Sequence, residues 1–137
     1  MTLFVDSSAF FAAADYDDRD HARAEAILSS GEPLVTSDHV LVESWLLLRR
    51  RLGRQPAEQY WAAVHSGACA LEPIVPADLE VAWSIGQIFA DQDFSIVDRT
   101  SFAVMQRLGV FRAASFDDDF AIFRFGPRRD RAFEVVL

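Results

Sequence analysis

The chain alternates between short apolar runs and longer segments in which apolar residues recur at helical spacing. The apolar runs have the length of strands and fall at residues 2–6, 33–37, 69–75 and 110–116, with 132–137 as an optional fifth. The intervening segments predict helices at residues 9–14, 17–31, 39–53, 57–66, 76–90 and 98–108. Strands that alternate with such helices predict a parallel sheet covered by helices on both faces.

Residues that favour helix ends lie at the boundaries of these segments. Ser7 or Ser8 is a candidate N-cap of the first helix, and Asp38 is the candidate for the third. Gly53 and Gly109 each follow a helical segment and are expected to end it. We therefore predict an α/β fold with four or five strands.

The composition narrows the class of protein. The chain has 137 residues, a length typical of one domain, which we assign to residues 1–137. Its net charge of -8 argues against a general basic surface for nucleic acid. All 13 basic residues are arginine, so the chain lacks the lysine that a P-loop or a Schiff base requires.

The hydropathy pattern contains no signal for a membrane or for export. No run approaches the roughly 18 consecutive apolar residues of a transmembrane helix, and the N-terminal residues do not resemble a signal peptide. The single cysteine, Cys69, excludes an intrachain disulfide and fits a reducing compartment. We expect a cytoplasmic protein with no membrane partner.

Four acidic residues stand in apolar surroundings, where water is expected to be scarce. Asp6 ends the first strand, Glu43 interrupts VLVESWLLL, Asp98 follows SIV and Asp117 follows AASF. Each has a simpler interpretation as a helix cap, a rim residue or a turn residue. Because the carboxyl ends of parallel strands share one edge of a sheet, we expect Asp6 and Asp117 to meet there, with Asp98 nearby.

Such a cluster of carboxylates requires a compensating charge. Neighbouring carboxylates repel one another, and some stay protonated unless a cation intervenes. Oxygen ligands suit Mg²⁺ or Mn²⁺, whereas one cysteine and three scattered histidines do not give the ligand spacing of a zinc site. A divalent ion held by carboxylates indicates phosphate chemistry, in which the metal activates water and stabilises the reacting oxygens.

The same acids lie in segments that resemble the four motifs of PIN-domain nucleases. LFVDSSAF resembles the first motif, and VESWLLLRRRLG resembles the glutamate helix, particularly that of VapC-like toxins of bacterial toxin–antitoxin modules. FSIVDRTSFAVMQRLG and SFDDDF resemble the third and fourth motifs, and all four occur in the family's order. The resemblance implies a PIN-like three-layer α/β/α sandwich with a mostly parallel central sheet of four or five strands.

The resemblance also implies a metal site. The residues that match the family's metal-binding acids are Asp6, Glu43, Asp98 and Asp117, with Asp119 as an accessory ligand or an alternative to Asp117. Some of them would bind Mg²⁺ or Mn²⁺ directly and others through water.

Three further residues lie near these acids in the sequence, and we consider a role for each. Ser8 matches the small polar residue that supports the first aspartate in the family. Arg99 stands where relatives often have a smaller residue, and it would contact a substrate phosphate or temper the local negative charge. Ser7 has no assigned role, because the sequence offers no base that would make it a nucleophile.

By resemblance, the chain is expected to be a metal-dependent endoribonuclease that hydrolyses phosphodiester bonds of tRNA or rRNA and acts as a toxin in a bacterial or archaeal cell. Arginines cluster at residues 49–54 and 128–131 and suit bidentate contact with phosphate. The first cluster also has a structural explanation, because cations favour helix C-termini.

A VapC-like protein would form a homodimer and be inhibited by a VapB-like antitoxin, whose tail occupies a hydrophobic groove. Candidate groove residues are Phe10, Phe11, Trp45, Leu46 and the segment FAIFRF at 120–125. At helical spacing, however, we expect most of these residues to belong to the core.

Two other functions are compatible with parts of the pattern. The first is a catalytically idle PIN-like module that binds RNA or protein, which the retention of all four acids disfavours. The second is an acid-pocket phosphatase that resembles haloacid dehalogenases. These enzymes have an aspartate where Ser8 stands and a supporting lysine, which this chain lacks.

Overall fold

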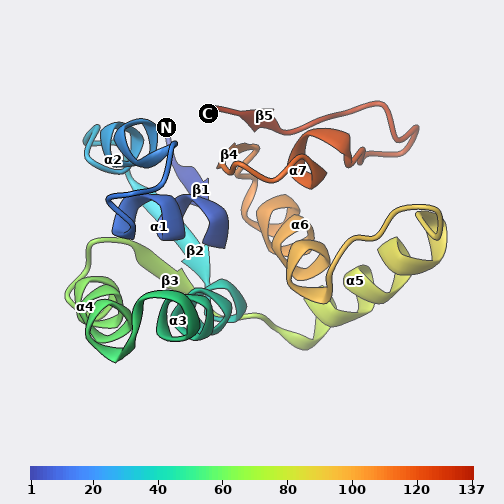
Figure 1. Cartoon of the computed structure of the whole chain (residues 1–137). Coiled ribbons are helices and arrows are strands. Elements are labelled where there is room, and N and C mark those ends of the chain that lie inside the picture. Colours follow the sequence, from blue (N-terminus) through green and yellow to red (C-terminus); the bar gives the residue numbers. More distant parts are fainter.

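The computed structural model describes residues 1–137 and contains one five-stranded sheet (Figure 1). The strands lie in the order β3-β2-β1-β4-β5, and every neighbouring pair is parallel. Their bounds are β1 Leu3–Val5, β2 Leu34–Ser37, β3 Ala70–Glu72, β4 Arg112–Ala114 and β5 Glu134–Val135. All three residues of the central strand β1 are buried, as expected for a parallel strand covered on both faces.

Seven helices connect the strands. They are α1 Ser7–Ala14, α2 His21–Leu28, α3 Asp38–Leu52, α4 Arg54–His65, α5 Pro76–Ile88, α6 Ile96–Leu108 and α7 Asp119–Ile122. Helices α1 to α4 pack together, and α5 packs along α6 on the connection that returns from β3 to β4 (Figure 1). Right-handed crossovers place these two groups on opposite faces of the sheet. The predicted α/β sandwich with a parallel sheet is confirmed.

None of the seven helices combines the length and the apolar character that crossing a bilayer requires.

The short helix α7 was not predicted from the sequence, because its four residues, which begin at the last of three aspartates, are too few to show a helical period. The strands are shorter than the apolar pattern suggested, whereas α1, α4 and α6 begin two or three residues earlier than predicted.

Helix α3 begins one residue earlier than predicted. Ser37, and not Asp38, is its N-cap, and the Ser37 hydroxyl accepts the backbone N–H of Val40 at 3.0 Å. The Asp38 carboxylate instead accepts the N–H of Ile74 at 3.0 Å. The predicted cap was therefore wrong because the loop after β3 competes for the Asp38 side chain.

Helices α1 and α6 also begin differently from the prediction. Asp6 is the N-cap residue of α1, and neither Ser7 nor Ser8 caps it, because both hydroxyls donate to carboxylates. Helix α6 begins two residues before Asp98, and Ser95 caps it by accepting the N–H of Asp98 at 3.1 Å. Asp98 is therefore not an N-cap, and its side chain is available for another role.

Phenylalanine rings form much of the core and fix the C-terminal segment. Phe102 of α6 stacks on Phe123, with ring centroids 4.4 Å apart, and meets Phe120 of α7 edge to face at 5.0 Å. Phe125 is buried as well, so three rings of the FAIFRF segment belong to the core and are not exposed in a groove. Leu46 is 57% exposed and remains a candidate surface residue.

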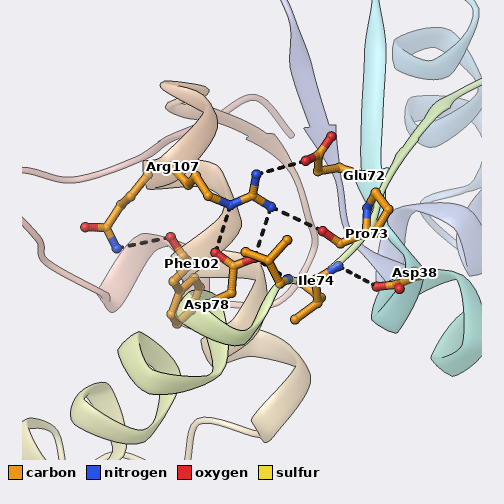
Figure 2. Close-up of polar contacts among 9 residues, drawn as sticks. Asp38, Glu72, Pro73, Ile74, Asp78, Phe102 and Arg107 are labelled. Carbon is orange, nitrogen blue, oxygen red and sulfur yellow. Dashed lines mark hydrogen bonds and ion pairs between the residues drawn. The ribbon is translucent and has the colours of Figure 1, made fainter.

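Arg107 of α6 bonds the end of β3, the loop after it and the start of α5. The Arg107 guanidinium donates to both carboxylate oxygens of the buried Asp78 at 3.0 Å, to Glu72 at 2.9 Å and to the carbonyl of Pro73 at 3.2 Å (Figure 2). Asp78 also accepts the N–H of Val75 at 3.0 Å. The link between β3 and α5 is thus held against α6.

We expect Arg107→Ala to destabilise the protein by about 2 kcal/mol. Removing one partner of a fully buried pair costs about 3–5 kcal/mol, and the Arg107 side chain is 32% exposed. Arg107 lowers the pKa of Asp78, so the difference should be full above pH 3.8 and shrink as the pH falls further and Asp78 becomes protonated. Urea denaturation at pH 7 and pH 3 measures both effects.

Arg54→Ala is the matched control, because Arg54 forms an exposed pair with Glu58 at 3.4 Å. Its effect should stay within about 0.5 kcal/mol. Equal destabilisation by the two substitutions would contradict a special role for the Arg107 contacts.

Candidate metal centre

The fold brings the sequence-predicted acids to one end of the sheet. Asp6 follows β1 and Asp117 follows β4, which is the neighbouring strand. Asp98 lies in the first turn of α6, and Glu43 lies on α3. Because β1 and β4 are parallel, their carboxyl ends deliver both aspartates to the same edge.

Two serine hydroxyls hold the Asp6 carboxylate in place. Ser8 and Ser115 each donate to Asp6 Oδ2 at 2.9 Å. Their oxygens in turn accept the backbone N–H groups of Phe116 and Asp117, at 2.9 and 3.0 Å. Neither hydroxyl donates to Oδ1.

Burial is the main influence on the ionisation of Asp6. Desolvation raises its pKa, and the hydrogen bonds from Ser115 and Ser8 oppose this effect. The charge of Glu43 raises the pKa of Asp6 further. Glu43 is itself oriented by Ser7, whose hydroxyl donates to Glu43 Oε1 at 2.7 Å.

Three further aspartates form a compact acidic group. One carboxylate oxygen from each of Asp98, Asp117 and Asp119 lies within 4.8 Å of the other two. The backbone N–H of Asp119 donates to Asp117 Oδ1 at 3.0 Å, so a tight turn fixes the two side chains relative to each other. Both candidates for the fourth acid therefore face Asp98.

Repulsion and burial within this group favour protonation when no metal is bound. Desolvation, a hydrogen bond with Asp119 and the charges of Asp6, Asp117 and Asp119 together raise the pKa of Asp98 to about 8. Burial likewise raises the pKa of Asp117. A divalent cation would relieve this repulsion, and the all-oxygen donor set of Asp98, Asp117 and Asp119 could hold one.

Two residues of the site were missed by the sequence reasoning. Ser115 was not considered, although a hydroxyl residue at the end of a strand and two positions before an aspartate is a recognisable signal. Ser7 was left without a role, because its partner Glu43 is 36 residues away. Only the packing of α1 against α3 brings the two together.

Arg99 points away from the acids. Its Nε donates to the carbonyl of Phe94 at 3.1 Å, and its guanidinium lies directly against Gly86 of α5, where a Cβ atom would displace it. These contacts fasten the start of α6 to α5. Contact between Arg99 and a substrate phosphate stays a prediction.

Comparison with known proteins identifies the family. The model of the PIN domain family matches residues 3–126, so the chain belongs to the PIN-domain family. The sequence is 39% identical over 130 residues to the 23S rRNA-specific endonuclease VapC20 of Mycobacterium tuberculosis, from strains CDC 1551 / Oshkosh and ATCC 25618 / H37Rv. The match covers 90% of this chain and 95% of that protein. The resemblance inferred from the four motifs is confirmed.

Solved structures show the same fold. The crystal structure of VapC20 of M. tuberculosis, described as a sarcin-ricin loop cleaving toxin, matches with a TM-score of 0.83 and 36% identity, over 88% of this chain and 93% of that one. VapBC2 from Rickettsia felis matches at 0.66 with 7% identity, over 88% and 91%. FitAcB from Neisseria gonorrhoeae matches at 0.60 with 14% identity, over 87% and 89%.

We expect Asp98→Asn to stabilise the metal-free protein at alkaline pH. The raised pKa means that folding favours protonated Asp98, so the parent loses stability as the pH rises from 3.8 to about 8. Asparagine has no such proton to lose. In EDTA, the melting temperature of the variant should exceed that of the parent by about 3 °C or more at pH 8.5 and by less at pH 5.

The same variant should respond weakly to metal. Mn²⁺ at about 100 times its Kd stabilises a protein by about 2.7 kcal/mol, and Asp98→Asn should lose most of that shift. Asp130→Asn, which changes an exposed aspartate outside the cluster, serves as the control. An unchanged Mn²⁺ response in Asp98→Asn would show that Asp98 is not a ligand.

Proposed function

We propose that this chain is a divalent-metal-dependent endoribonuclease and the toxin of a toxin–antitoxin module. The observation that carries the proposal is the group formed by Asp98, Asp117 and Asp119 beside the buried Asp6, in a PIN-domain chain. The 39% identity with a 23S rRNA-specific endonuclease, over 90% of the chain, supports the same reaction.

The chain's own side chains would arrange the reaction. Asp98, Asp117 and Asp119 would hold Mg²⁺ or Mn²⁺, with Asp6 and Glu43 bound directly or through water. A bound ion supplies a deprotonated water and neutralises charge on the phosphodiester. Ser8 and Ser115 would position Asp6 by keeping its Oδ2 occupied. Ser7 would keep Glu43 directed at the site, since its hydroxyl bonds Oε1.

The preferred substrate in this proposal is ribosomal RNA. The relative at 39% identity is named for 23S rRNA, and its crystal structure is described as that of a toxin that cleaves the sarcin-ricin loop. The sequence alone left tRNA and rRNA as alternatives. Total RNA from cells that express the protein, mapped for new 5′ ends, distinguishes the two substrates.

An antitoxin partner and a homodimer belong to the same proposal. VapBC2 and FitAcB, which share this fold, are toxin–antitoxin complexes, and this supports an antitoxin partner. Apolar side chains that such partners could cover are exposed on α3 and α5, among them Val42 and Leu46, each 57% exposed, and Trp83, 67% exposed. Light scattering of the purified chain, alone and with the co-expressed antitoxin, measures both associations.

We expect Asp6→Asn and Asp98→Asn to slow RNA cleavage by at least about 100-fold in saturating Mg²⁺. Each substitution removes a negative oxygen from the acidic cluster while preserving its shape. EDTA should abolish cleavage by the parent, and added Mg²⁺ or Mn²⁺ should restore it. The measurement is the rate of cleavage of a 23S rRNA fragment that contains the sarcin-ricin loop.

Asp130→Asn should cut the fragment at the parental rate. Parental rates in both Asp6→Asn and Asp98→Asn would refute the assigned site. A parent that binds Mn²⁺ but cuts no RNA would instead favour the idle binding module.

A further inference from the structure

A hollow of about 650 Å³ lies directly beside the metal centre. Ser7 and Glu43, which belong to the centre, line one part of it. His39 and Arg50, also from α3, line it together with the exposed apolar residues Val42 and Leu46. The hollow therefore joins the carboxylate cluster to a surface that carries basic and apolar groups.

The basic residues flank Glu43 along one side of α3. His39 precedes Glu43 by one helical turn, and Arg50 follows it by seven residues, which is about two turns. From His39 to Arg50 the helix axis extends about 16 Å, at 1.5 Å per residue. This side of α3 thus carries a basic group on either side of the acid.

The ring of His39 is held in one orientation. Thr100 Oγ1 is 3.2 Å from the carbonyl of Val97 and donates to it, so its lone pairs remain to accept the Nδ1–H of His39 at 3.1 Å. This bond places a proton on Nδ1, so Nε2, which has no hydrogen-bond partner in the protein, can donate only when the ring carries its second proton. His39 also lies within electrostatic range of Asp78, but that carboxylate is already bonded to Arg107.

Arg50 differs from the neighbouring arginines in where its side chain lies. Arg51 lies over the ring of Phe11, with its guanidinium carbon 5.6 Å from the centroid. Arg49 is exposed but does not line the hollow. Within the cluster at residues 49–54, Arg50 is thus the arginine that faces the space beside Glu43.

We propose that this hollow binds the RNA strand next to the bond that is cleaved, with the Nε2–H of a protonated His39 and the Arg50 guanidinium donating to phosphate oxygens. This inference rests on the proposed function. A chain with net charge -8 and a cluster of carboxylates repels a polyanion, so the substrate requires local cations beside the metal. Guanidinium and imidazolium donors form charge-assisted bonds to phosphate.

Affinity for RNA tests this assignment separately from cleavage. All variants carry Asp6→Asn, which blocks cleavage, and the Kd of a fluorescent oligoribonucleotide with the sarcin-ricin loop sequence is measured by anisotropy in Mg²⁺. Arg50→Ala should weaken binding about 10-fold and reduce the slope of log K against log salt by about 0.7. Arg49→Ala, the matched control, should leave both the Kd and the slope unchanged.

Two substitutions at His39 separate substrate contact from a structural role. Asparagine can retain the bond to Thr100 but does not reach the position of Nε2, whereas glutamine can place an N–H donor there. His39→Asn should raise the Kd about 10-fold, and His39→Gln should remain within about 3-fold of the parent. The melting temperatures and the Mn²⁺-induced shifts of both variants should equal those of the parent.

Distinct results would overturn this inference or the function on which it rests. Parental RNA affinity in both His39→Asn and Arg50→Ala, or equal losses in Arg49→Ala and Arg50→Ala, would remove the RNA subsite. Weaker antitoxin binding with unchanged RNA affinity would assign the hollow to a protein partner. RNA binding that depends on His39 and Arg50, in a parent that cuts no RNA, would retain the subsite and refute the proposed nuclease.

Discussion

The desolvation of several carboxylates at one end of the sheet is the constraint on which the rest of the site depends. An isolated ionised carboxylate in an apolar environment is strongly disfavoured, and neighbouring negative charges increase the penalty. The protein reduces this penalty at Asp6 with two serine hydroxyls and leaves it largely uncompensated at Asp98, whose pKa rises to about 8. An arrangement that is unfavourable without a cation is favourable for binding one. The local instability of the acidic group would thus be the physical basis of an affinity for metal.

Holding these charges together requires a rigid support, because repulsion would otherwise spread them apart. Phe120 lies in α7, the helix that begins at Asp119, and Phe123 follows it. Both pack on Phe102 of α6, the helix that carries Asp98. The apolar burial of these rings therefore opposes the repulsion between Asp98 and Asp119. Arg107 contributes at the other end of α6, where its bonds to Asp78 and Glu72 fix that helix to the segment after β3. The packing of the core therefore holds the acidic residues in position.

The sequence predicted the parallel sheet and the acids, because strand ends and buried charges are local signals. Asp6 and Asp117 could be placed at one edge from the rule that parallel strands share their direction. Helix caps were predicted less well: Ser7 or Ser8 was the candidate cap of α1, but both hydroxyls donate to carboxylates, and Ser37 caps α3 in place of Asp38. These errors share a cause, since a polar side chain can satisfy several partners and tertiary contacts decide among them. The bond of Ser7 to Glu43 spans 36 residues and leaves no trace in the local pattern.

For the same reason, net charge alone is a poor predictor of whether this chain binds RNA. A net charge of -8 describes the field at a distance, but close contacts with phosphate depend on groups within a few ångströms. At the centre, acids that would repel RNA are the same acids that could hold a cation, and a bound divalent ion would offset part of their negative charge. His39 and Arg50 add basic groups along α3 beside this centre. An acidic protein can thus bind a polyanion, provided that its negative charge is concentrated where a divalent ion neutralises it.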